Sequence, residues 1–209
     1  MNVLAIGAHF DDVEIGCGGT LARLVQQGHN VHVYVATRSG YASFDNSPVR
    51  SSEVSLAEGV RAAEILDVTL HTGEFETFHL EFGDALNTEI RRIVDSVRAD
   101  TVFSLGTWDV HNDHWALARA TLHATRHVPR LACYRCNWYA ADRPFHGTLY
   151  FDITDTLERK LAAIRAYQSE WERAGKRWAA YFTNQSRNDG MVAGVQYAEC
   201  FETVRWLLP

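Results

Sequence analysis

Short apolar runs alternate along the chain with longer segments in which apolar residues recur at helical spacing. The short runs have the length and composition of buried strands and cover residues 2–7, 31–36, 67–72 and 101–105. Two later strands are predicted near residues 131–139 and 148–153. The helical spacing, with glycine or polar residues at its ends, predicts helices at residues 20–28, 50–66, 84–98, 113–126 and 155–168.

The alternation of strands and helices predicts the fold class. Strands separated by helices of about ten or more residues are typical of βαβ units and a parallel sheet. We therefore interpret residues 1–209 as one α/β domain, with a Rossmann-like, mostly parallel sheet and helices on both faces. The segment after residue 171 is mixed and contains three glycines, so small additional strands are expected in the C-terminal third.

Composition narrows the class of protein further. The chain has 20 basic and 26 acidic residues and a net charge of −6, which argues against a nucleic-acid binder. No apolar run approaches the roughly 18 residues of a membrane span, and the first residues lack the features of a signal peptide, so a cytoplasmic location without membrane contact is expected. The four cysteines are expected to stay free thiols. Ten histidines are the unusual count, because histidine is the commonest metal ligand.

Four ionisable residues follow the first predicted strand within six positions. They are His9, Asp11, Asp12 and Glu14. Ligands of open α/β sheets bind beyond the carboxyl ends of the strands, and adjacent carboxylates repel each other unless a cation or a proton intervenes. A metal ion held by His9 and one aspartate would remove that repulsion, and the other aspartate would be free to accept a proton from water.

Two other interpretations of this segment stay open. Asp11 or Asp12 could cap backbone amides at the start of a helix. The glycines of Gly16-Cys17-Gly18-Gly19 could belong to a dinucleotide-binding loop. Against the second interpretation, the G-x-G-x-x-G pattern is missing and three acidic residues would face the pyrophosphate.

A second cluster follows the fourth predicted strand, where His111-Asn112-Asp113-His114 begins a helix. Histidines three positions apart lie on roughly one helix face, so both can converge on the sheet edge where His9 also ends. Asp113 can accept an imidazole N–H, as carboxylates do for metal-binding histidines. A histidine at a helix start can also be a simple cap, but the two clusters together predict a metal site.

These two segments resemble the signatures of the LmbE/PIG-L-like family of zinc-dependent N-deacetylases. The family pattern Ala-His-Pro-Asp-Asp, a glutamate and Gly-x-Gly-Gly corresponds to residues 8–19, and His-x-Asp-His corresponds to residues 111–114. The order Val13-Glu14 is similar to the order found in the family branch that serves bacillithiol-type pathways. Weaker similarities extend the resemblance to about residues 3–203. Phe10 stands where the family usually has proline, which would free the loop or add an aromatic wall to the site.

The resemblance implies roles for the residues that match the signatures. His9, Asp12 and His114 would bind the metal, with Zn²⁺ as the expected ion and Fe²⁺ as the alternative in the cell. Asp11 would be the general base.

Three further residues receive roles from the same resemblance. His111 would stabilise the tetrahedral oxyanion or act as an acid, and Asp113 would orient His111. Arg50 would contact the substrate through a hydroxyl or an anionic group.

The function that the resemblance implies is a metal-dependent hydrolase that removes an N-acetyl group from an amino sugar or a related small N-acylated molecule. Relatives often form trimers or hexamers, so a homo-oligomer is expected. An amide hydrolase or deformylase acting on another N-acyl metabolite is the alternative, and a nucleotide-binding Rossmann-type domain is a more distant one.

Several other residues that can carry chemistry receive no role. Cys133 and Cys136 have the spacing of a redox or zinc-knuckle pair, but a zinc ribbon needs a second pair, and positions i and i+3 of a strand point to opposite faces. They are expected to be core thiols. His123 and His127 lack the glutamate of a metalloprotease helix and are expected at the surface. Loop aromatics such as Tyr41, Trp138 and Tyr139 are assigned to ordinary packing, although any of them could stack on a sugar ring.

Overall fold

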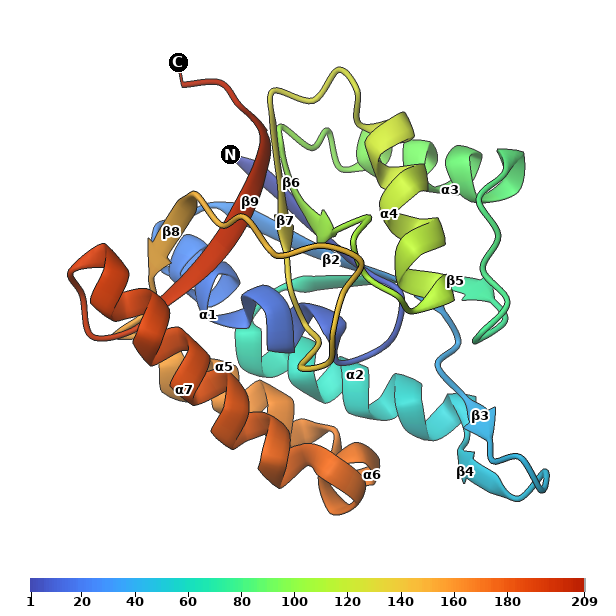
Figure 1. Cartoon of the computed structure of the whole chain (residues 1–209). Coiled ribbons are helices and arrows are strands. Elements are labelled where there is room, and N and C mark those ends of the chain that lie inside the picture. Colours follow the sequence, from blue (N-terminus) through green and yellow to red (C-terminus); the bar gives the residue numbers. More distant parts are fainter. Residues whose placement is uncertain (209) are drawn as a thin grey trace.

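A seven-stranded sheet lies between two layers of helices in the computed structural model, which describes residues 1–208 (Figure 1). The strand order is β5-β2-β1-β6-β7-β9-β8, and a separate hairpin pairs β3 with β4. The strands are β1 (Asn2–Gly7), β2 (Asn30–Thr37), β3 (Tyr41–Ala42), β4 (Pro48–Arg50), β5 (Thr69–Phe75), β6 (Thr101–Leu105), β7 (Arg130–Tyr134), β8 (Leu149–Asp152) and β9 (Ala198–Trp206).

Helices cover both faces of the sheet. On one face α1 packs against α2 and α5, and on the other face α3 packs against α4 (Figure 1). The helical segments are α1 (Asp12–Gln26), α2 (Ser52–Leu66), α3 (Asp84–Ser96), α4 (Asn112–Ala124), α5 (Leu157–Ala166), α6 (Gln168–Glu170), the π-helical segment η1 (Trp171–Gly175) and α7 (Lys176–Ala193). The predicted fold class is confirmed, because the five strands from β5 to β7 pair in parallel.

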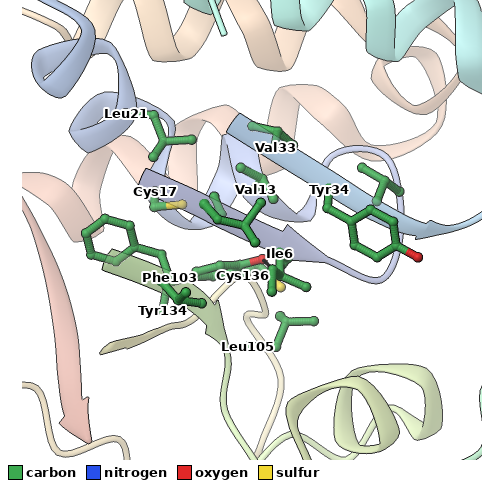
Figure 2. Packing of buried hydrophobic residues seen from close by; sticks show 14 of the residues in the cluster. Ile6, Val13, Cys17, Leu21, Val33, Tyr34, Phe103, Leu105, Tyr134 and Cys136 are labelled. Atoms are coloured by element: carbon green, nitrogen blue, oxygen red, sulfur yellow. Dashed lines mark hydrogen bonds between the residues drawn. The ribbon is translucent and has the colours of Figure 1, made fainter. Parts of the chain in front are cut away.

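Helix α1 begins at Asp12, so the prediction of a glycine-rich loop before a helix at Thr20 was wrong. Glycine lowers helix propensity, but here it lets the helix approach the sheet. A Cβ on Gly16 would lie 2.1 Å from the ring of Tyr134, and a Cβ on Gly19 would lie 2.9 Å from Ile153. Tyr134 in turn donates a hydrogen bond from its hydroxyl to the carbonyl of Ile6 on β1, at 2.8 Å (Figure 2).

The same finding removes the dinucleotide-loop interpretation. Gly16, Gly18 and Gly19 all lie inside α1 rather than in the loop that precedes it. A phosphate-binding loop presents backbone N–H groups before the helix, whereas here Asp11 ends the loop and Asp12 and Glu14 lie in the first turn of α1.

The last third contains the additional strands that the sequence predicts, together with a helix that it does not. Strand β9 pairs antiparallel with both β7 and β8. Helix α7 was missed because its polar sequence and Gly190 suggested irregular structure; a Cβ on Gly190 would lie 2.7 Å from the backbone of Gln196. Strand β7 ends at Tyr134, five residues earlier than predicted, and the following loop reaches the sheet edge described below.

The sheet order fixes where a ligand can bind. Strand β1 pairs with β2 on one side and with β6 on the other, and the chain leaves these neighbouring strands in opposite directions. A crevice forms at such a switch point, outside the carboxyl ends of the strands. The two predicted clusters follow β1 and β6. Within residues 1–208, no helix is long and apolar enough to cross a membrane.

Candidate metal centre and active site

A cavity of about 290 Å³ lies where β1 and β6 end, and the two predicted clusters meet in its wall. His9, Asp11 and Asp12 line it from the loop after β1 and the start of α1. His111 and His114 line it from the start of α4. The structure thus brings together side chains that are about 100 positions apart in the sequence.

Three candidate donor atoms converge at the base of this cavity. His9 Nδ1 lies 3.2 Å from His114 Nε2, and His114 Nε2 lies 3.3 Å from Asp12 Oδ1. The second oxygen of Asp12 accepts the backbone N–H groups of Ala8 and His9, each at 2.9 Å. Asp12 is therefore held by the loop, with Oδ1 facing His114 and Oδ2 lying 3.7 Å from His9 Nδ1.

Each of these two histidines has its other nitrogen on a carboxylate. His9 Nε2 lies 2.8 Å from Asp113 Oδ2, and His114 Nδ1 lies 2.8 Å from Asp109 Oδ2. Such carboxylate partners fix the tautomer and ring orientation of metal-binding histidines. The nitrogens left free are the two that face each other and Asp12.

The resemblance implied that Asp113 orients His111. In the structure the Asp113 carboxylate does not have this role. Its fully buried carboxylate bonds to His9 and accepts the backbone N–H groups of Phe78 at 2.7 Å and Leu80 at 3.1 Å. Its hydrogen bond to His111 runs through its own backbone N–H instead. The correction has a simple cause: the carboxylate lies on the side of α4 that faces the loop after β1, where His9 is.

His111 is both a helix cap and a wall of the cavity. Its Nδ1 accepts the backbone N–H of Asp113 at 3.2 Å, which places the ring hydrogen of the neutral form on Nε2. Burial lowers the pKa of His111 to about 4, and the neighbouring His114 and His9 act in the same direction. The neutral ring therefore offers one N–H donor.

Asp11 occupies the position before α1 with a left-handed backbone, at φ 118°, and its side chain caps no amide. The capping interpretation is therefore wrong for Asp11. An aspartate held at positive φ costs free energy, and such residues cluster at functional sites. Desolvation and the Asp12 carboxylate raise the pKa of Asp11, while Arg50 lowers it.

The charge of Asp12 is set by its histidines. Burial alone would raise the pKa of Asp12, but His114 and His9 hold it below its usual range. The pKa of His114 is correspondingly raised by Asp12 and Asp109, against the effect of burial. The carboxylates around His114 thus favour a positive charge at the centre of the cluster.

Arg50 lines the cavity, but its guanidinium is already paired. It lies 3.1 Å from Glu58 and 4.0 Å from Glu170, and its side chain is 3% exposed. Among the described residues its Nε has no hydrogen-bond partner. Arg50 therefore reaches the cavity with its charge balanced, which leaves little net positive charge for a substrate.

Phe10 does not form a wall of the cavity. Its ring is 2% exposed and packs against Gly59 of α2, where a Cβ would lie 2.3 Å from the ring. Its backbone N–H donates to Ser39 Oγ at 2.9 Å, a hydrogen bond that proline could not make. The loop is thus held by packing and by this hydrogen bond rather than by a proline ring.

Sequence reasoning missed three residues of the site. Asp109 holds His114, Asn137 donates from Nδ2 to Asp109, and Cys136 donates from Sγ to Asp12 Oδ1 at 3.4 Å. The sequence feature that could have identified Asp109 as a site residue is its place in the loop after β6. Nothing in the sequence showed which residue its carboxylate contacts. Asn137 and Cys136 come from the loop after β7, whose path depends on tertiary structure.

Aromatic side chains form the outer part of the cavity. Trp138 lies near Trp178 with ring centroids 5.4 Å apart, and Tyr41 meets Phe78 edge to face at 5.6 Å. Trp138 is 47% exposed and Phe78 is 49% exposed. Three aromatics that were assigned to ordinary packing therefore line the cavity, namely Tyr41, Trp138 and Tyr139.

The side chains present fit a metal ion. Two overlapping clusters of potential ligands share His114: one adds His9 and His111, and the other adds Asp12 and Cys136. Imidazole nitrogens and one carboxylate are a donor set typical of zinc, and three such ligands leave a position open. The carboxylates of Asp113 and Asp109 are the outer partners that such a site requires.

The chain belongs to the GlcNAc-PI de-N-acetylase (PIG-L) family, whose model matches residues 4–125 and so includes both clusters.

Among curated proteins, the chain is similar to an uncharacterized deacetylase, YaiS, of Escherichia coli K12, with 33% identity over 80% of this chain and 90% of the relative. It is also similar to the diacetylchitobiose deacetylase of Thermococcus kodakarensis, with 29% identity over 94% of this chain and 80% of the relative.

Solved structures share the fold. The conserved protein TT1542 from Thermus thermophilus superposes with a TM-score of 0.84 at 24% identity, covering 100% of this chain and 97% of the other. GalB, the 4-carboxy-2-hydroxymuconate hydratase of Pseudomonas putida, superposes with a TM-score of 0.82 at 17% identity, covering 100% and 98%. Because a hydratase shares this fold, the fold alone does not fix the reaction.

Proposed function

We propose that this protein is a metal-dependent hydrolase that removes the N-acetyl group from an amino sugar or a related small N-acylated molecule. Membership of the deacetylase family and the likeness to a diacetylchitobiose deacetylase support the reaction class. The observation that carries the metal dependence is that His9 and His114 face each other while each holds a carboxylate on its far nitrogen.

His9, Asp12 and His114 would hold the metal, with Zn²⁺ proposed and Fe²⁺ as the alternative. A metal ion in this position supplies Lewis acidity and lowers the pKa of water toward 7. The chain's own contribution is the rigid placement of the three donors by Asp113, Asp109 and the loop amides.

Asp11 would accept the proton of the attacking water. It lies beside Asp12 in the cavity wall, and its raised pKa makes it a stronger base than an exposed aspartate. Its strained backbone position is consistent with a side chain that is placed for chemistry rather than for stability.

His111 would donate a hydrogen bond to the oxyanion that forms on the acyl carbon. The hydrogen on Nε2 and the lowered pKa suit a neutral donor, and they argue against a role as a protonated acid. A donor that is already in place stabilises the developing charge without reorganisation.

The cavity favours a neutral sugar. Exposed aromatic rings such as those of Trp138 and Tyr139 offer apolar faces on which a sugar ring can stack. Glu58 and Glu170 balance the charge of Arg50, so an anionic substrate group gains little there. We therefore propose that Arg50 contacts a hydroxyl group.

The proposal is tested with a panel of N-acetylated and N-formylated amino sugars, measuring the released primary amine. We expect release from neutral N-acetyl amino sugars, loss of release after dialysis against a chelator, and recovery on adding Zn²⁺. Release only from N-formyl compounds would favour the deformylase alternative. Undiminished turnover in demonstrably metal-free protein would contradict the metal-dependent mechanism.

Replacement of His111 by alanine should lower kcat about a hundredfold, because it removes one donor to the oxyanion. KM should change little, since the interaction forms mainly in the transition state. Steady-state kinetics check this result, with His123→Ala as the control because that histidine is exposed on the same helix. A rise in KM at unchanged kcat would instead assign His111 to ground-state binding.

A further inference from the structure

Cys136 differs from the other candidate core thiols in the polar groups that it meets. It follows β7, is 3% exposed, and belongs to the buried cluster drawn in part in Figure 2. The residue also lines the cavity, and its Sγ donates to Asp12 Oδ1 at 3.4 Å. Cys133, three positions earlier on β7, is equally buried but does not line the cavity. Both cysteines are buried free thiols, as expected, but only Cys136 also lines the cavity.

The sulfur lies among the candidate metal donors. One donor atom each from Asp12, His114 and Cys136 lie within 4.8 Å of one another. The successive separations are 3.2 Å from His9 Nδ1 to His114 Nε2, 3.3 Å from there to Asp12 Oδ1, and 3.4 Å from Asp12 Oδ1 to Cys136 Sγ.

Each of these three separations has the length of one edge of a tetrahedral zinc site, while His9 and Cys136 belong to two different groups of close donors that share His114. With metal bonds of about 2.0–2.1 Å to nitrogen, 2.0–2.2 Å to oxygen and 2.3 Å to sulfur, the edges are roughly 3.3 Å between nitrogens, 3.4 Å from nitrogen to oxygen and 3.6 Å from oxygen to sulfur. The three observed separations are within about 0.2 Å of these values.

We propose that Cys136 supplies a thiolate ligand to the metal that His9, Asp12 and His114 hold. The proposal rests on the metal site of the proposed function and adds a sulfur donor to its two nitrogens and one oxygen. The S–H bond breaks as the metal–sulfur bond forms, the proton passes to solvent, and no group changes oxidation state.

Two consequences follow from a sulfur ligand. Four protein donors do not prevent hydrolysis, because zinc can expand to five ligands during a reaction. A soft thiolate also shifts metal preference toward Zn²⁺ and away from Mn²⁺ and Mg²⁺, which prefer oxygen donors. The competing arrangement keeps the thiol protonated and hydrogen-bonded to Asp12, and then the metal has no sulfur neighbour.

The test uses the full chain loaded with Co²⁺ and, separately, with Zn²⁺. We expect the cobalt protein to show a near-ultraviolet sulfur-to-cobalt charge-transfer band, and X-ray absorption of the zinc protein to show one sulfur neighbour at about 2.3 Å. Both signals should disappear in Cys136→Ser and in Cys136→Ala, and both should persist in the matched control Cys133→Ala. Circular dichroism verifies that each variant is folded.

The outcomes separate this proposal from the function on which it rests. Stoichiometric metal without a sulfur signal in the unaltered chain overturns the role of Cys136 and leaves the metal-dependent hydrolase intact. A sulfur signal that survives in a folded Cys136 variant also overturns it. Absence of bound metal contradicts both proposals. In support, Cys136→Ser should weaken Zn²⁺ binding about tenfold or more, measured by chelator competition, with a smaller change for Mn²⁺.

Discussion

Replacing Asp11 with asparagine is expected to reduce deacetylation about a thousandfold or more, to near the background rate, while the metal content stays unchanged. General-base catalysis contributes typically about 10²–10⁴-fold, and the amide cannot accept the proton of the attacking water. Asparagine keeps the size of the side chain and tolerates the left-handed backbone at φ 118°, so the loop should keep its shape. Product release and elemental analysis of the same sample measure the two quantities.

The control for this variant is Asp155→Asn, because that aspartate is exposed and does not line the cavity. It should change neither turnover nor metal content. Near wild-type turnover of Asp11→Asn would show that another group accepts the proton. Loss of metal from Asp11→Asn would instead place this carboxylate among the ligands, and the roles of Asp11 and Asp12 would have to be reconsidered.

The sequence allowed the sheet and the position of the site to be predicted, because both depend on local patterns. Apolar runs such as residues 2–7 and 101–105 have few alternatives to a buried strand, and both are strands in the structure. Polar residues directly after them must lie at the carboxyl edge of a parallel sheet. For that reason the cluster at His9 and the cluster at His111–His114 could be placed together without any knowledge of the intervening residues, whereas the choice of Asp12 as the ligand came from the family resemblance.

The features that escaped prediction depend on contacts between distant segments. Gly16 and Gly19 appeared to be loop residues because their role, the close approach of α1 to Tyr134 and Ile153, involves residues far away in the sequence. The partner that the resemblance implied for Asp113 was His111, but in the fold the Asp113 carboxylate contacts His9, which is about 100 positions away in the sequence.

Arg50 shows a different limit of sequence reasoning. Its position in the cavity wall agrees with a substrate contact, but its pairing with Glu58 and Glu170 is invisible in the sequence. A charge that is neutralised by buried partners selects different ligands from a free one. The class of substrate that we propose, a neutral sugar, therefore depends on this structural observation.

Replacing His114 with alanine should abolish stable metal binding and, with it, turnover. His114 joins both potential ligand clusters and contacts Asp12 directly, so its loss removes the donor at the centre of the site. Elemental analysis after dialysis measures the metal content. His123→Ala on the same helix is the control and should keep its metal. Full metal content in His114→Ala would remove His114 from the ligands.

The substitution Asp109→Asn should weaken metal binding, whereas His114→Ala should abolish it. The substitution keeps the shape of the side chain that holds His114 Nδ1 but removes its charge, so the ring is less firmly oriented and less basic. Outer partners of this kind contribute typically about 10–100-fold to metal affinity. We therefore expect metal to bind to Asp109→Asn with affinity lowered by about that factor, measured by chelator competition, and turnover to recover at saturating Zn²⁺. Unchanged affinity would mean that Asp109 does not act through the metal ligand, because a residue that orients His114 must affect the bond that His114 makes on its other nitrogen.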